Sequence, residues 1–175
     1  KEFQIVTMAP PSSGGIALIQ MLKMLEKVDI GRMGFNTTET IDLMARSLDV
    51  VWPIRQKTAD PDFTDVFTEE LLSDSFVIQL AERARVGHLP LANDYQDNSK
   101  TTHLSVIDSH GNVVALTESL ECYFGSGVVV PGAGIFLNDT MHDFDPEPGK
   151  RNSIQPGKRP MSSMTPTIIF KDGSP

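Results

Sequence analysis

Hydrophobic positions recur at helical spacing near the start of the chain. Residues 2–8, "EFQIVTM", have the composition of a short strand, and "PPSSGG" ends that run. The segment that follows, residues 14–28, carries leucines three and four positions apart, which predicts a helix. Ser12 or Ser13 is expected to cap this helix, because a serine hydroxyl can accept a hydrogen bond from a free backbone N–H of the first turn.

Two further helical regions are expected before residue 87. Asn36, followed three residues later by Glu39, resembles a capping box and predicts a helix over 37–48. Residues 62–86 predict one or two more helices, since this segment ends in basic residues and a glycine.

The second half of the chain has a different pattern. Residues 89–100, "LPLANDYQDNSK", are polar and rich in turn-forming residues. "THLSVID" and "VVALTES" then alternate on either side of "SHGN", which predicts a β-hairpin. Residues 125–160 carry many glycines and prolines and are expected to be mostly loops, and "MTPTIIF" is rich in strand formers. Helices before strands indicate a layered α+β fold rather than strict βαβ alternation.

Composition narrows the classes of partner. The 175 residues suit one domain or most of one, and 39% are hydrophobic, which is enough for a core. The net charge of −8 argues against a nucleic acid or an anionic membrane as partner. No apolar run approaches the roughly 20 residues of a membrane span. The single cysteine, Cys122, excludes an intramolecular disulfide and favours the cytoplasm over the periplasm or the outside. Strand-like runs at both ends suggest a part of a longer chain.

The doubled threonine after the polar run suggests a nucleophile. Within a chain, a threonine hydroxyl has no adjacent base. If the Lys100–Thr101 bond is cut, the new α-amine of Thr101, with a pKa of about 8, can take the proton of its own hydroxyl. The alternative is that Thr101 and Thr102 are simply β-branched residues that begin a strand.

Several motifs together resemble one family. "TTHLSVIDSHGNVVALTES", "FGSG", "PGAGIFLND" and "KRPMSSMTPTIIF" are similar in content and order to the γ-glutamyltransferase family of N-terminal-nucleophile hydrolases. "APPSSGGIALIQML" resembles a segment late in the large subunit of that family. The resemblance implies a four-layer αββα sandwich and a precursor that cuts itself into two subunits. It makes residues 1–100 the end of the large-subunit region, with a processing linker at about 89–100, and residues 101–175 the start of the small-subunit region, within one fold.

The family chemistry follows from the same resemblance. A γ-glutamyl amide, such as glutathione or a related donor, would form an acyl-enzyme ester, which water or the amine of an amino acid or peptide resolves. No metal or organic cofactor is required. Apart from "HDFD", where His142, Asp143 and Asp145 are close, the scattered histidines show no metal-ligand spacing. The partners are the small-molecule donor and acceptor and the remaining parts of the two-subunit assembly.

The resemblance also assigns the reacting groups. Thr101 matches the nucleophile, and the cleavage site is the bond between Lys100 and Thr101. Ser119 stands where the family usually has a threonine whose hydroxyl assists the nucleophile. Without the family context, Ser119 reads as an ordinary hydroxyl at the end of a strand.

Five further positions correspond to substrate-binding positions of the family; three keep the usual residue and two do not. Asp143 matches the acid that holds the α-amino group of the donor, and Ser162 and Ser163 match the serine pair near its α-carboxylate. A capping carboxylate and a turn between strands are the alternatives for these motifs. Two positions depart from glutathione-handling members: Glu121 replaces an asparagine that helps to bind the carboxylate, and Thr140 replaces a glutamine or glutamate. A glutamate at 121 repels a donor carboxylate unless it is protonated or faces a cation.

These departures keep other functions open. Glu121 suggests an acylase-like branch, so a glutaryl or cephalosporin-type acylase is one alternative. An uncleaved, catalytically silent homologue that acts as a binding protein is another. By resemblance, the arginine that binds the donor carboxylate lies before residue 1, and the glycine pair of the oxyanion hole lies after residue 175.

Overall fold

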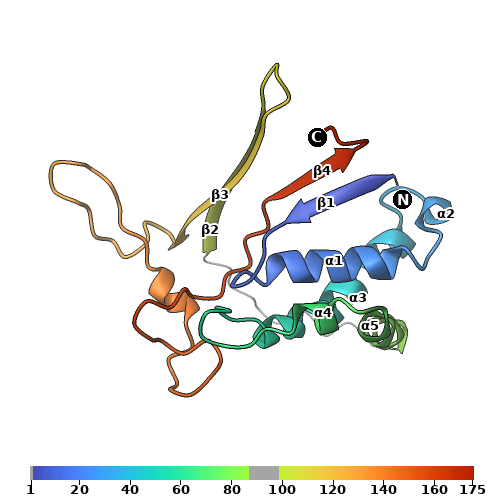
Figure 1. The fold of residues 1–175 in the computed structure, drawn as a ribbon, viewed down its shortest axis with the longest axis horizontal. Helices are drawn as coiled ribbons and strands as arrows, with labels where there is room; N and C mark the ends of the chain where they lie inside the picture. Colours follow the sequence, from blue (N-terminus) through green and yellow to red (C-terminus); the bar gives the residue numbers. More distant parts are fainter. Residues whose placement is uncertain (1, 87–98) are drawn as a thin grey trace.

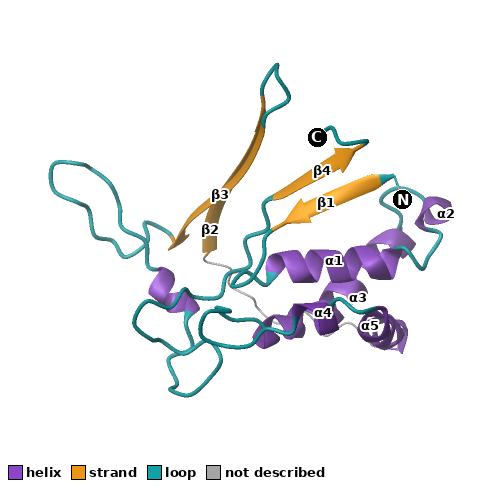
Figure 2. Cartoon of the chain, in the orientation of Figure 1, coloured by secondary structure: helices purple, strands orange, loops and turns teal. Residues whose placement is uncertain are grey.

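The computed structural model describes residues 2–86 and 99–175, with the side chains of Ser99 and Lys100 left out. The processing linker predicted at about 89–100 therefore lies almost entirely outside the described residues. Helices and antiparallel strands make up the described chain, with long loops between them (Figures 1 and 2). In chain order the elements are β1 (Phe3–Thr7), α1 (Gly14–Leu25), α2 (Ile30–Met33), α3 (Thr38–Val51), the 3₁₀ helix η1 (Trp52–Lys57), α4 (Thr68–Leu71), α5 (Asp74–Val86), β2 (Ser99–Ile107), β3 (Val113–Cys122), the 3₁₀ helix η2 (Thr140–Asp143) and β4 (Thr167–Lys171).

The helices before residue 87 build the hydrophobic core. Helix α5 buries Val77, Leu80 and Ala84, which are three and four positions apart and so share one face. Buried side chains of α1, α3, η1 and α4 pack against that face. The core comprises Ile16, Met24, Val50, Val51, Ile54, Leu71, Val77, Leu80 and Ala84. The apolar residues that recur at helical spacing in the sequence are therefore the ones that form this core.

None of the described helices combines the length and apolar character needed to cross a bilayer.

The predicted helix caps are only partly present in the structure. Helix α1 begins after Ser13 as expected, but the Ser13 hydroxyl donates to the carbonyl of Ser162 at 2.9 Å instead of capping the helix. The Ser12 hydroxyl accepts from the backbone N–H of Gly14, the first residue of α1, at 3.3 Å. Helix α3 is capped by Thr37, whose hydroxyl accepts from the N–H of Thr40 at 3.3 Å, and not by Asn36. Asn36 has a left-handed φ of 55°, a turn conformation that differs from the extended backbone of an N-cap residue.

Two antiparallel ribbons lie on one side of the helices (Figure 1). Strand β1 pairs with β4, so the first and last strands of the chain are neighbours, with Ile5 opposite Ile169. Strand β2 pairs with β3 as the predicted hairpin, with Thr101 opposite Ser119. The two ribbons approach each other through β3 and β4. The structure thus has the expected α+β character.

The hairpin turn fixes how β2 and β3 align. One carboxylate oxygen of Asp108 accepts hydrogen bonds from the backbone N–H groups of His110, at 2.8 Å, and Asn112, at 2.9 Å. Gly111 has a φ of +83°, a conformation that glycine adopts at little cost. The predicted "SHGN" turn is confirmed. Because side chains alternate along a strand, this alignment decides which residues share a face with Thr101.

Truncation of Leu80 tests the core. Leu80 is 2% exposed, so Leu80→Ala should lower the free energy of unfolding of the full-length protein by about 2–5 kcal/mol, because it leaves a cavity. Ile78→Ala in the same helix is the matched control, since Ile78 is 51% exposed, and it should cost less than about 1 kcal/mol. Urea denaturation measures both changes. Equal losses for the two variants would contradict this account of the core.

Candidate active site

The hairpin brings two predicted catalytic hydroxyls into contact. The hydroxyl of Thr101, on β2, donates to that of Ser119, on β3, over 3.1 Å. The Ser119 oxygen also accepts from the backbone N–H of Glu121 at 2.9 Å. Thr101 is exposed, so a ligand can reach its hydroxyl. The pairing of Thr101 with Ser119 that the sequence suggested is therefore present in the uncut chain.

The backbone is irregular on both sides of this contact. The register of β2 against β3 shifts between Ser99 and Thr101, which is where the predicted scissile bond lies. Such bulges are frequent next to active sites, where they redirect a side chain. Near the end of β3, Glu121 has a φ of 74°, a left-handed conformation that is uncommon for residues other than glycine. Strained backbone of this kind gathers at functional sites.

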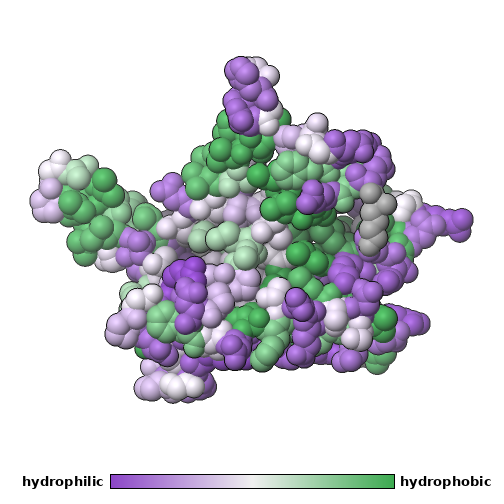
Figure 3. Space-filling model, viewed as in Figure 1, coloured by the Kyte–Doolittle hydropathy of each residue, from purple (hydrophilic) through white to green (hydrophobic). Residues whose placement is uncertain are grey.

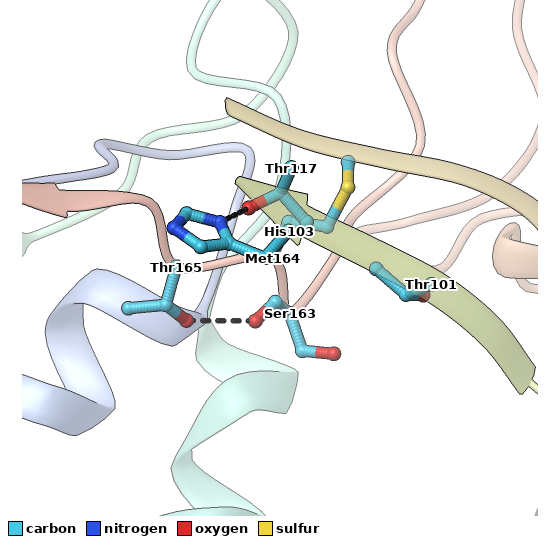
Figure 4. A pocket seen from close by; sticks show the side chains of 6 residues that line it. All are labelled: Thr101, His103, Thr117, Ser163, Met164 and Thr165. Atoms are coloured by element: carbon cyan, nitrogen blue, oxygen red, sulfur yellow. Dashed lines mark hydrogen bonds between the residues drawn. The ribbon is translucent and has the colours of Figure 1, made fainter. Parts of the chain in front are cut away.

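An open cavity of about 360 Å³ lies beside the Thr101 hydroxyl. Two segments that are more than 40 positions apart in the sequence form its walls, namely the hairpin and the segment that leads into β4 (Figure 4). The lining residues are Thr101, His103, Thr117, Ser163, Met164 and Thr165. Two of the predicted site residues, Thr101 and Ser163, thus face the same space.

Four of the lining residues were not predicted as site residues. His103 and Thr117 were detectable in principle, because alternation along two paired strands places them on the same face as Thr101 and Ser119. Nδ1 of His103 lies 2.7 Å from the Thr117 hydroxyl, and Nε2 lies 3.1 Å from that of Ser105. Both ring nitrogens therefore have hydroxyl partners, which hold the imidazole in place at the side of the cavity. Beyond their nearness to Ser163, the sequence carries no signal for Met164 and Thr165.

The start of α1 holds the serine pair in place. The backbone N–H of Ser13 donates to the carbonyl of Ser162 at 2.8 Å, and the Ser12 hydroxyl donates to the carbonyl of Met164 at 2.7 Å. The backbones approach closely here, since a Cβ on Gly14 would lie 2.5 Å from the carbonyl oxygen of Ser163. The "PPSSGG" run is therefore a docking point for the serine segment as well as the beginning of a helix.

A second group of predicted residues contains two carboxylates. Asp143 ends η2 and is partly buried. Burial first, and then the negative charge of Glu121, raise the pKa of Asp143 to about 6, while Arg55 acts in the opposite direction. The carboxylate of Asp139 accepts from the backbone N–H of Cys122 at 3.1 Å, which ties η2 to the end of β3. A cationic group such as an ammonium can relieve the repulsion between the carboxylates of Asp143 and Glu121.

The remaining predicted positions contribute less to the geometry. Thr140 begins η2, and its hydroxyl donates to the side-chain oxygen of Asn138 at 2.6 Å, so that group already takes part in a local turn. Its assignment to substrate binding stays a prediction. Lys100 belongs to β2, but its side chain lies outside the described residues. Ser162 presents its carbonyl to Ser13, and only Ser163 of the pair lines the cavity.

The fold defines the class of protein. The structure of a cephalosporin acylase from Bacillus halodurans matches the whole chain with a TM-score of 0.76 at 24% identity, over 32% of that longer chain. At this identity the match concerns the fold alone. It confirms the predicted α+β fold, and this chain forms one part of that longer fold.

Sequence comparison then gives the family. The model of the gamma-glutamyltranspeptidase family matches residues 1–175, and the chain belongs to this family. The glutathione hydrolase proenzyme of Bacillus subtilis (strain 168) is 40% identical over 99% of this chain. The acylase ACY 1 proenzyme of Pseudomonas sp. (strain SE83) is 37% identical over 98% of it. The chain spans about a third of these relatives, 33% and 31% of their lengths.

The two carboxylates provide a test of the site's electrostatics. Glu121→Gln should lower the pKa of Asp143, because it removes a negative charge that opposes ionisation. Glu118→Gln is the matched control on the same strand, since Glu118 is exposed and pairs with Thr102. A pH titration of the ¹³C-labelled aspartate carboxyl groups, read by NMR, gives the pKa in each variant. An unchanged pKa in Glu121→Gln, or an equal fall in both variants, would refute the coupling.

Proposed function

We propose that the full-length protein cuts itself between Lys100 and Thr101 and then uses Thr101 as an N-terminal nucleophile on γ-glutamyl amides. The observation that carries the proposal is the 3.1 Å contact between the hydroxyls of Thr101 and Ser119. This contact lies at a register shift, at the start of a strand and beside an open cavity. On this proposal residues 1–100 end the large subunit and residues 101–175 begin the small one.

A cytoplasmic location is also proposed, because the chain has a single cysteine, Cys122, and so no intramolecular disulfide.

Self-cleavage begins with the group that later catalyses turnover. The Thr101 oxygen attacks the carbonyl carbon of Lys100, the C–N bond breaks, and the released amine keeps the hydroxyl proton. Water then hydrolyses the resulting ester, which frees the Lys100 carboxylate and the Thr101 hydroxyl. Ser119 supports the attack because its oxygen already accepts the Thr101 hydrogen bond and so orients the hydroxyl.

Turnover uses the amine that the cut creates. The α-amine of Thr101 takes the hydroxyl proton, the oxygen attacks the γ-carbonyl of the donor, and the leaving amine departs with a proton. Water, or the amine of an amino acid or peptide, resolves the ester. Asp143 binds the donor ammonium, and the hydroxyls of Ser162 and Ser163 donate hydrogen bonds to the α-carboxylate. No cofactor is needed, and the rest of the two-subunit assembly supplies the other donor contacts.

Replacement of Thr101 tests the first step. Full-length Thr101→Ala should stay uncut, because no hydroxyl is present to attack, while the wild type splits between Lys100 and Thr101. Thr101→Ser is the matched control: it keeps the hydroxyl and should still split, if more slowly. Intact-mass measurement over the course of incubation follows each protein. A folded wild type that stays whole would favour the silent binding protein instead.

An acylase is the second candidate function. Glu121 is the observation that favours it, because a negative charge coupled to Asp143 repels the α-carboxylate of a γ-glutamyl donor and so favours other acyl amides. The resemblance to an acylase proenzyme points the same way. Such an enzyme would keep the Thr101 nucleophile and the self-cleavage and would differ only in the acyl group that it accepts.

A donor panel separates the two candidates. The cleaved protein should hydrolyse γ-glutamyl anilide faster than glutaryl anilide, since only the first carries the ammonium that the carboxylates attract. Glu121→Asn should narrow this preference, because both donors carry the carboxylate that Glu121 repels, and only γ-glutamyl anilide loses an attraction for its ammonium. The measurement is kcat/KM for both anilides. A wild type that prefers glutaryl anilide would establish the acylase reading.

A further inference from the structure

An ion pair between a buried carboxylate and a half-exposed guanidinium joins the two sides of the predicted cut. The carboxylate of Asp60 has 1% of its side-chain surface exposed, and it accepts hydrogen bonds from the backbone N–H of Arg159 at 2.8 Å and from its Nε at 3.0 Å. Nη2 of the same guanidinium pairs with the other Asp60 oxygen. These partners are 99 positions apart in the sequence, and they lie on opposite sides of the Lys100–Thr101 bond.

Both carboxylate oxygens of Asp60 have partners. The backbone N–H of Asp62 donates to Oδ1 at 3.2 Å, in addition to the Arg159 contacts. The hydrogen bonds from Arg159 hold the pKa of the Asp60 carboxyl well below its usual range, so this group is charged across the neutral range. Nη2 of Arg159 also reaches the exposed carboxylate of Asp62 at 2.9 Å. Loss of the Arg159 charge would leave the buried Asp60 carboxylate uncompensated, which is strongly unfavourable, whereas the Arg159 side chain is 53% exposed and keeps contact with water.

The ion pair is close to the substrate-binding positions along the chain. Arg159 precedes Ser162 by three residues. Between them, the backbone N–H of Met161 donates to the side-chain oxygen of Asn152 at 3.0 Å. The amide nitrogen of Asn152 donates in turn to the carbonyl of Asp143 at 2.6 Å. One continuous set of contacts therefore connects the ion pair to the serine pair and to the proposed ammonium site.

Neighbouring cations attach the same segment to the same loop. Lys158 is buried, and its ammonium donates to the carbonyl of Arg151 at 2.7 Å and lies 5.8 Å from the centre of the Phe63 ring. Arg151 reaches back to the carbonyl of Asp65 at 2.8 Å. A lysine almost never becomes this buried without a structural reason. The segment that carries the serine pair is thus docked on residues 60–65 by several contacts, of which the Asp60 pair is the buried centre.

We propose that Asp60 and Arg159 are a positioning pair, which holds the Ser162–Ser163 segment at the Thr101 cavity and keeps it there once the chain is cut. Neither residue lines the cavity, so both act through the serine segment and neither touches the reacting atoms. The catalytic part of this inference rests on the proposed function, whereas the docking part does not.

Three full-length variants test the pair. Asp60→Asn keeps the shape of the side chain and removes the charge. Arg159→Lys keeps the charge and removes the forked geometry of the guanidinium. Asp62→Asn is the matched control, because Asp62 contacts the same Nη2 atom but is exposed. Hydrogen exchange followed by mass spectrometry measures the protection of residues 159–165 and of α1, α3 and α5 in each protein.

The expected result is a local loosening that affects donor binding. In Asp60→Asn, exchange at 159–165 should accelerate by about tenfold or more, while α1, α3 and α5 keep their protection. KM for γ-glutamyl anilide should rise by about tenfold, and kcat should change by less than about threefold, because the nucleophile is untouched. Arg159→Lys should change the same quantities in the same direction. Asp62→Asn should stay within about twofold of the wild type.

Other results would overturn the proposal. Wild-type protection at 159–165 in both Asp60→Asn and Arg159→Lys would show that the pair positions nothing. A uniform loss of protection in both variants would show a general structural role instead. If Asp60→Asn does not fold, Arg159→Lys alone decides between these results. A wild type that neither splits nor hydrolyses the anilide would refute the proposed function, and the exchange data would still decide the docking part.

Discussion

The alignment of β2 with β3 is the constraint on which the site depends. Side chains alternate along a strand, so a slip of one residue would turn Thr101 and Ser119 to opposite faces of the hairpin. The Asp108 turn sets the alignment at one end, and the Ser119 contacts with Thr101 and Glu121 set it at the other. The position of the Thr101 hydroxyl is therefore determined mainly by local contacts within 21 residues, from 101 to 121.

The segment that carries Ser162 and Ser163, the serine segment, is positioned by a different kind of contact. Its position depends on contacts with residues that lie about 100 to 150 positions earlier in the chain, at the start of α1 and in the loop after η1. The chain thus builds one half of the cavity from a hairpin and the other half from long-range docking. In a protein that is cut before Thr101, those long-range contacts, together with the pairing of β1 with β4, link the two products without a covalent bond.

Sequence patterns predicted the parts of the fold that depend on periodicity. Helices α1, α3 and α5 and the β2–β3 hairpin follow from apolar spacing and from a turn rich in Asp, Gly and Asn. The caps were predicted less well, because Ser13 makes a tertiary hydrogen bond that no local pattern encodes. The same reason explains why the ion pair of Asp60 and Arg159 was missed. Both residues look like ordinary surface charges until the fold places them together.

Most residues of the candidate site were predicted from motifs shared with a known family, and fewer from residue spacing and chemistry. Thr101 and Ser119 follow from alternation once a hairpin is assumed, and the structure brings their hydroxyls together. The coupling of Glu121 to Asp143 could not be predicted from spacing, because it arises where η2 folds back onto the end of β3. Neither periodicity nor charge pattern reports on such loop packing.

The left-handed backbone at Glu121 also has an evolutionary consequence. β-Branched and bulky residues are disfavoured in this conformation, whereas asparagine, aspartate and glycine tolerate it. An exchange of glutamate for asparagine at position 121 would therefore relieve backbone strain while it removes the negative charge that acts on Asp143. Position 121 can thus change its charge, and with it the ionisation of Asp143, without a loss of fold stability.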